Sequence, residues 1–306
     1  MNLKNGNNNN LNFNIIKNLY IDIDVIISMS IFPSGNLISI SKDKSIKIWD
    51  IELNLLQRIQ EENLISDINI KDENNFIICT LCFIKIYFRN NNKFEIKDII
   101  KNIVNSNFIK VKYFPEEKIF SSSIDNKIII WEKTNNKYQN ITTINFSEYI
   151  SFLLLEDIQI LISSGYEKSI FWNIKTFEIL FSIENFNSNY FYYYHNTICR
   201  IDKNKIIIVK GNDNIMKVIS IPKKKIIKEI DNQFGCYGIY FIKDKSIFLT
   251  YGDSDIIKIY RNDNYKLIYM FEYKFEHFIK GFIKMKDNLI LSYLDNGEIL
   301  FWEIND

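Results

Sequence analysis

The chain has 306 residues, enough for one large β domain or two ordinary domains, and 47% of them are hydrophobic, which argues against disorder over most of its length. Its 38 basic and 37 acidic side chains give a formal net charge of +1, so no long-range field favours nucleic acid or an anionic membrane as a partner. No segment offers about 18 consecutive uncharged apolar residues, and the N-terminus lacks the apolar core of a signal peptide. We expect a soluble protein, not secreted and not membrane-spanning, of the cytoplasm or, alternatively, the nucleus.

The first twelve residues contain the asparagine run Asn7–Asn10 and are expected to be disordered. Residues 13–306 are expected to form a single domain. The chain holds only 9 Gly and 3 Pro, so asparagine is the local turn signal, because it tolerates positive φ and bonds to its own backbone.

The clearest predicted element is a hairpin in residues 37–51. Apolar and polar side chains alternate in Leu37–Ser41 and again in Ser45–Ile51, and Lys42-Asp43-Lys44 between them has the composition of a turn. Flanking strands are predicted at Val25–Phe32 and Leu55–Gln60. A lone hairpin is marginally stable in water, so this four-stranded unit is expected to recur.

The unit recurs along the chain, with an aromatic or apolar anchor at a fixed place in the third strand. The anchors are Trp49, Tyr87, Trp131, Trp172, Ile219, Tyr260 and Trp302. Successive anchors are 38 to 47 residues apart, close to the period of roughly 40–45 residues that is typical of four-stranded propeller blades. The first strand of each later unit is predicted near Ile65–Ile70, Phe108–Phe114, Tyr149–Leu155, Tyr190–Ile201, Cys236–Ile242 and Phe278–Met285.

The last unit stops at Ile304, after its third strand, and would leave an open sheet edge. Asn14–Ile21 precedes the first unit and belongs to no other, so it is predicted to supply the missing strand. The expected fold class is all-β: a seven-bladed β-propeller of four-stranded antiparallel blades, with the last blade closed by the N-terminal strand.

The sequence resembles the WD-repeat β-propeller family from about residue 13 to its end. The first repeat matches best, with Ile26, Ser28, Ile31, Pro33, Gly35, Ser41, Asp43, Ser45 and Trp49-Asp50 where the family pattern expects such residues. The resemblance implies closure through the two termini. The repeats are degenerate and do not identify a subfamily.

The resemblance also implies a buried hydrogen-bonded set in each blade, made of Trp, Ser or Thr, Asp and His. Expected structural anchors are Ser41, Asp43, Trp49, Ser123, Asp125, Trp131, Trp172, Trp302 and His277, the last of these 25 residues ahead of Trp302. The histidine is missing from blades one and three. A buried Asp without that partner needs another donor, and we expect the backbone amides of the turn to contribute.

Motifs that would carry chemistry are weak or missing. Cys79 and Cys82 form a Cys-x-x-Cys pair, but its odd spacing in a strand points the two thiols to opposite faces, and no second pair or nearby His completes a zinc site. Both are expected to be reduced, small buried side chains. His195 and His277 are too isolated for a metal site. No phosphate-binding glycine loop or Gly-x-Ser-x-Gly elbow occurs. We therefore expect no enzyme activity, metal or cofactor.

The expected function is a scaffold that binds partner proteins or peptide segments on the face formed by the inter-blade loops and organises a larger complex. The candidate anchors are aromatic residues in or beside those loops, chosen because such residues dominate protein interfaces: Phe108, Tyr149, Tyr190, Tyr192, Phe234, Tyr237 and Phe278. The run Tyr190–Tyr194 is either core or an exposed hot spot.

Two other classes remain open from the sequence. One is a propeller that binds nucleic acid or phosphoinositides, although Lys223-Lys224-Lys225 is the only basic run and Phe88-Arg89-Asn90 lacks the rest of a Phe-Arg-Arg-Gly motif. The other is an enzymatic propeller, against which the scarcity of His weighs. Neither nucleic acid, a membrane nor a small-molecule substrate is the expected partner.

Overall fold

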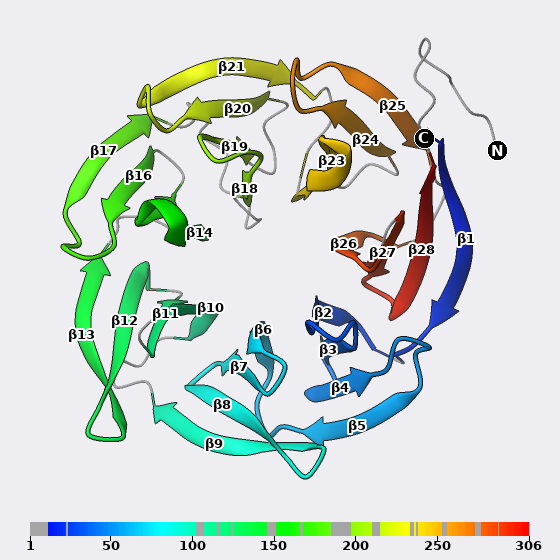
Figure 1. Cartoon of the computed structure of the whole chain (residues 1–306). Coiled ribbons are helices and arrows are strands. Elements are labelled where there is room, and N and C mark those ends of the chain that lie inside the picture. Colours follow the sequence, from blue (N-terminus) through cyan, green and yellow to red (C-terminus); the bar gives the residue numbers. More distant parts are fainter. Residues whose placement is uncertain are drawn as a thin grey trace. The chain divides into compact units, whose positions relative to one another are not determined.

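The computed structural model describes residues 12–22, 24–101, 107–114, 117–123, 125–145, 151–165, 168–184, 197–209, 215–232, 236, 238–252, 256–272, 277–286 and 288–305. Seven four-stranded antiparallel sheets account for the described strands, and they define a seven-bladed β-propeller (Figure 1). We call the four strands of a blade a, b, c and d in chain order. The predicted fold class is confirmed.

Two compact units divide the chain. One comprises Leu11–Ser147 with Lys280–Asp306 and holds blades seven, one, two and three. Its strands in blades one to three are β2 (Ile26–Ile31), β3 (Leu37–Ser41), β4 (Ser45–Trp49) and β5 (Leu55–Gln60); β6 (Ile65–Asp72), β7 (Asn75–Thr80), β8 (Phe83–Asn90) and β9 (Lys93–Lys101); and β10 (Phe108–Phe114), β11 (Lys118–Ser123), β12 (Lys127–Thr134) and β13 (Lys137–Asn145).

The second unit, Glu148–Ile279, holds blades four, five and six. Its strands are β14 (Ser151–Leu155), β15 (Ile160–Ser164), β16 (Lys168–Asn173) and β17 (Ile179–Glu184); β18 (Thr197–Arg200), β19 (Lys205–Val209), β20 (Ile215–Ser220) and β21 (Lys225–Asp231); and β22 (Gly238–Ile242), β23 (Ile247–Tyr251), β24 (Ile256–Arg261) and β25 (Leu267–Glu272). Short 3-10 turns at Glu156–Ile158 and Lys243–Lys245 connect strands a and b of blades four and six.

Blade seven joins the two ends of the chain. Its strands are β26 (Ile279–Lys284), β27 (Leu289–Leu294), β28 (Glu298–Asn305) and, in the d position, β1 (Asn12–Tyr20). The β1–β28 register runs from Asn12 opposite Asn305 to Tyr20 opposite Glu298. The predicted closure by the N-terminal strand is therefore confirmed. Residues 1–11 lie outside the described part, so the expected disorder of residues 1–12 stays a prediction.

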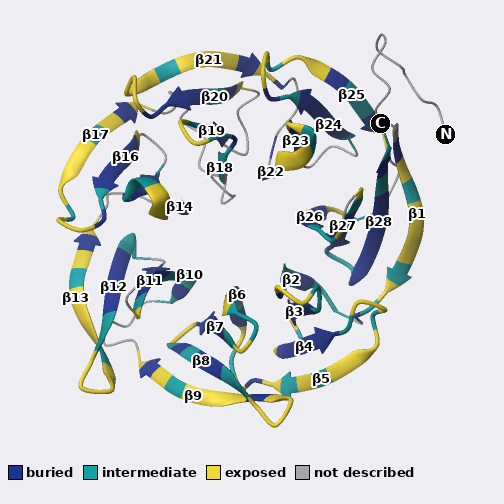
Figure 2. Ribbon diagram, viewed as in Figure 1, coloured by how far each residue is buried: buried dark blue, intermediate teal, exposed yellow. Residues whose placement is uncertain are grey.

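Burial follows the strand position within a blade. Strands b and c carry nearly continuous buried apolar runs, whereas the d strands are largely exposed (Figure 2). Apolar faces of adjacent blades pack together within each unit, as in the cluster of Ile46, Ile48, Phe76 and Tyr87 between blades one and two. Burial of this surface is the main driving force for blade packing.

In blade one, strands b and d have the predicted boundaries, strand a is one residue shorter at each end than predicted, and strand c ends at Trp49 rather than at Ile51. The cause is Asp50, whose Oδ1 accepts the amide hydrogens of Glu52 (3.0 Å) and Asn54 (2.7 Å) and so forms a turn. In the described part of the chain, no helix has the length and hydrophobicity that crossing a bilayer would require.

Candidate functional site

Four blades carry a buried tryptophan whose indole Nε1 donates a hydrogen bond to a serine on strand b. The pairs are Trp49 with Ser39 (3.1 Å), Trp131 with Ser121 (2.8 Å), Trp172 with Ser163 (2.8 Å) and Trp302 with Ser292 (2.8 Å). All four indoles and all four serines are buried. The bond satisfies a donor that would otherwise be stranded in the apolar interior.

The hydrogen-bonded serine lies two residues before the one predicted in blades one and three. Trp49 pairs with Leu37, so the diagonal neighbour on the same face is Ser39, while Ser41 lies one step too far. The buried Ser41 instead accepts the amide hydrogen of Asp43 at 3.4 Å. In blade three the buried Ser123 donates its hydroxyl hydrogen to the carboxylate of Asp125, and Ser121 accepts the indole hydrogen of Trp131.

Asp43 finds partners without a histidine. Its carboxylate accepts the Ser45 amide hydrogen (2.8 Å) and a guanidinium hydrogen of Arg58 (3.0 Å), and Lys47 lies 3.6 Å away. The expected contribution of a turn amide is confirmed, and two cations add to it. Burial opposes ionisation, but these hydrogen bonds and charges outweigh it and lower the pKa of Asp43 below its usual value.

A lysine two residues before the anchor makes a second polar contact, which reaches the segment just before strand a. Lys47 Nζ lies 2.6 Å from Asp22, and Lys85 Nζ lies 2.5 Å from Glu61; all four side chains are largely buried. Tyr87 also donates its hydroxyl hydrogen to Glu61. Asp22 follows blade seven and Glu61 follows blade one, so each pair connects one blade to the next.

Blade six uses an amide in place of the acid. The backbone carbonyl of Asn232 accepts a hydrogen bond from the ammonium group of Lys258. Its side-chain Oδ1 accepts the hydroxyl hydrogen of Tyr260 at 2.8 Å. We call the three lysine contacts, Lys47 with Asp22, Lys85 with Glu61 and Lys258 with Asn232, the lysine latches. They occupy the place where the resemblance implied a histidine. The recurring Lys two residues before Trp49, Tyr87 and Tyr260 was the sequence signal that could have revealed them.

The predicted partner-binding residues fall into three groups. Phe108 is only 1% exposed and packs edge-on against Trp131, so it belongs to the core and its prediction as a surface anchor is wrong. Phe278 is 44% exposed, immediately before β26. The other five, together with His195, lie outside the described residues: Tyr149, Tyr190, Tyr192, Phe234 and Tyr237. His277 is half-buried just before β26, the position predicted for it.

Two exposed apolar residues lie at the edge of blade two where strand a begins and the b–c turn lies, which we call the d–a edge. Ile65 pairs with Thr80, so Leu64 and Leu81 are the next residues on the two strands, and each is 37% exposed. The backbone carbonyl of Leu81 accepts the amide hydrogen of Phe108 in the next blade. Leu64 occupies the same place in blade two as Phe278 does in blade seven.

Among the described residues, no further side chains complete a metal site around the pair Cys79 and Cys82. Cys79 is buried and Cys82 is exposed, so the thiols do point in different directions, but the prediction that Cys82 is buried is wrong. It lies in the b–c turn rather than in a strand. Burial raises the pKa of the Cys79 thiol, which disfavours a thiolate. Within the described ranges, no group of three or more His, Cys, Asp or Glu side chains is placed to hold a metal ion.

Comparison with known proteins does not assign the chain to a family. No protein-family model matches the sequence, and none of the curated proteins compared with it matches either. The class of protein is therefore defined by the structure alone, as a seven-bladed β-propeller.

Proposed function

We propose that this protein is a WD-repeat propeller of the cytoplasm or nucleus that acts as a non-catalytic scaffold for partner proteins. The repeat spacing, the buried Trp-Ser bonds and the closure of blade seven by β1 support the family assignment. Propellers commonly bind other proteins, but a fold alone does not determine function, so the proposal needs a specific surface.

The observation that carries the proposal is the pair of exposed leucines at the d–a edge of blade two. A single exposed apolar side chain is ordinary, but Leu64 and Leu81 are adjacent, and the equivalent position in blade seven carries the exposed Phe278. Adjacent exposed apolar side chains at a sheet edge are a usual setting of a protein-binding surface.

Affinity purification with quantitative mass spectrometry tests this surface. The double variant Leu64→Asp/Leu81→Asp should lose specific partners at least tenfold while retaining its melting temperature. Leu56→Asp, on the exposed d strand of blade one, is the matched control and should retain them. If both variants retain the same partners at the same level, the d–a edge of blade two is not the binding surface.

A further inference from the structure

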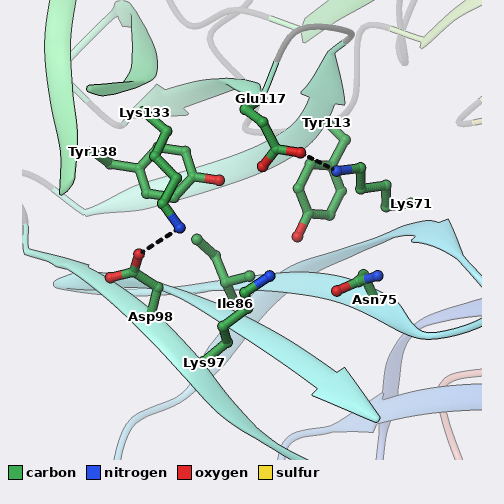
Figure 3. Close-up of a pocket in the computed structure, with 9 residues that line it drawn as sticks. All are labelled: Lys71, Asn75, Ile86, Lys97, Asp98, Tyr113, Glu117, Lys133 and Tyr138. Atoms are coloured by element: carbon green, nitrogen blue, oxygen red, sulfur yellow. Dashed lines mark hydrogen bonds and ion pairs between the residues drawn. The ribbon is translucent and has the colours of Figure 1, made fainter. Parts of the chain in front are cut away.

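A polar cleft lies between blades two and three, at the edge opposite to Leu64 and Leu81. Blade two contributes the end of β6, the start of β7 and the middle of β8 and β9, and blade three contributes residues of β10, β12 and β13 with Glu117. Its lining residues are Lys71, Asn75, Ile86, Lys97, Asp98, Tyr113, Glu117, Lys133 and Tyr138 (Figure 3). Three ammonium groups and two phenol hydroxyls thus gather around one space.

Lys97 differs in chemical type from the residue at the equivalent position in each of the other six blades. Every d strand has a β-bulge opposite the anchor, and Lys97 is the extra residue in β9, since Ile86 pairs with Asp98 and Tyr87 pairs with Ile96. The extra residue is apolar in all the other blades: Ile16, Leu56, Ile141, Leu180, Ile227 and Ile268. Only in blade two does the bulge direct a cation, and it directs it into the cleft.

Lys71 also differs from the residues at the equivalent position in other blades. It follows Ile70, the strand a residue opposite Phe76, which in turn faces the anchor Tyr87. The same position in blades one, three, four, five and six is apolar and buried: Phe32, Phe114, Leu155, Ile201 and Ile242. A position that packs the core elsewhere carries a charge here.

The boundary between blades one and two shows which side chains occupy the equivalent positions there. Between blades one and two, Phe32 stacks on Phe94 with a centroid distance of 5.4 Å, and both rings are buried. The matching residues between blades two and three are Lys71 and Tyr138, because Phe94 and Tyr138 hold the same place in their d strands. The stacked Phe32 and Phe94 fill the space between blades one and two, whereas Lys71 and Tyr138 line an open cleft between blades two and three.

Charge in the cleft is only partly compensated. Lys71 Nζ lies 2.6 Å from Glu117, and Lys133 Nζ lies 3.6 Å from Asp98, whereas Lys97 makes no ion pair with any described residue. Lys71, Lys97 and Lys133 all act on Glu117 and lower the pKa of its carboxyl, with the Lys71 hydrogen bond the largest cause. An anion is therefore already stabilised at this place.

Hydrogen-bond donors complete the site. Burial raises the pKa of Tyr113 and of Tyr138, so both phenols keep their protons at neutral pH and can donate. Figure 3 shows both hydroxyls and the ammonium groups of Lys97 and Lys133 pointing into the space. The Glu117 side chain is 52% exposed, so it can turn into solvent when a stronger anion enters.

We propose that the cleft between blades two and three binds a phosphomonoester group through the ammonium groups of Lys71, Lys97 and Lys133. A phosphate dianion has three terminal oxygens for these charges and for the two hydroxyls, whereas a carboxylate has two oxygens and one charge. The group is borne either by a small molecule or by a phosphorylated side chain. Glu117 and Asp98 at the cleft disfavour an extended anionic surface such as a membrane. This site does not depend on the function proposed above.

Isothermal titration calorimetry with two probes, inorganic phosphate and N-acetyl-O-phosphoserine amide, tests the proposal. Lys97→Ile installs the kind of residue found at the other bulges, so it should fold normally and weaken binding roughly tenfold, the value of one charge-assisted hydrogen bond. Lys101→Ile, on the same strand outside the cleft, is the matched control and should change affinity less than about twofold. Glu117→Gln removes the competing carboxylate and should tighten binding several-fold.

The outcomes separate the possible sources of the phosphate. Binding of the phosphoserine amide several-fold more tightly than inorganic phosphate supports a phosphorylated side chain, and equal binding supports a small molecule. The proposal is overturned if neither probe binds at millimolar concentration, if Lys97→Ile and Lys101→Ile weaken binding equally, or if Glu117→Gln weakens it. Binding only to vesicles that contain a phosphoinositide would also overturn it, in favour of a membrane surface.

Discussion

At the scale of single residues, the buried indole hydrogen bonds place polar contacts within a largely apolar blade interior. The indole of Trp49 is packed against blade seven and still donates to Ser39. Ser39→Ala leaves a buried indole hydrogen without an acceptor, and it should lower the free energy of unfolding by about 1–3 kcal/mol. Ser41→Ala should cost less, because Ser41 accepts only one long backbone bond. Urea denaturation of the two variants decides which serine supports the tryptophan.

Asp43 gives a prediction about pH. Its pKa is lower in the folded protein than its ordinary value of 3.8, so the charged form stabilises the fold above that value, and this contribution is lost as the pH falls through the folded pKa. Asp43→Asn should therefore melt at a lower temperature than the wild type at pH 7, and the difference should shrink below about pH 3.8. A melting difference that is constant from pH 7 to pH 2.5 would show that the charge of Asp43 is not involved.

At the scale of strands and blades, features that depend on local sequence were predicted more completely than contacts between residues far apart in the chain. The boundaries of β3, β5 and β10 follow from alternation and turn residues, and these were predicted to the residue. The lysine latches were missed because Lys85 and Glu61 are 24 residues apart, and only the packing of one blade on the next brings them together. The cleft was missed for the same reason, since Lys71 and Lys97 differ from the repeat only once the register of every blade is known.

The Glu61–Lys85 latch should behave as a buried ion pair. Glu61→Gln retains an acceptor for Tyr87 but leaves Lys85 without its anionic partner. Lys85→Met leaves Glu61 without its cationic partner. Each variant should lower the free energy of unfolding by about 3–5 kcal/mol. The double variant should cost clearly less than the sum, because no unpaired buried charge remains.

The matched control is the exposed pair of Arg200 and Asp157, whose removal should cost under about 1 kcal/mol. Chemical denaturation of the four variants of each cycle supplies the coupling energies. Additive losses at Glu61 and Lys85 would show that the two residues stabilise their blades separately.

At the scale of the whole molecule, repetition explains why the fold was predictable and the two proposed binding sites were not. Residues that recur, such as Trp49 and Trp131, fill the same structural position in several blades and report the architecture. Residues that hold a ligand or partner are the exceptions to the repeat, so their identity follows from no period. Phe108 was misjudged for this reason: its place beside a loop suggested exposure, while its contact with Trp131 buries it.

The β1–β28 pairing joins the N-terminal and C-terminal parts of the described chain within one sheet. Deletion of residues 1–24 removes β1 and Asp22, which exposes the edge of β28 and leaves Lys47 without its buried partner. We expect a large fall in melting temperature, whereas Ile16→Ser, an exposed change on the same strand, should have little effect. A peptide of residues 12–24 should raise the melting temperature of the truncated protein with increasing concentration, because it binds the folded state only. An unchanged melting temperature after the deletion would mean that closure contributes no stability, and failure of the peptide alone would mean that β1 must be covalently attached to pair.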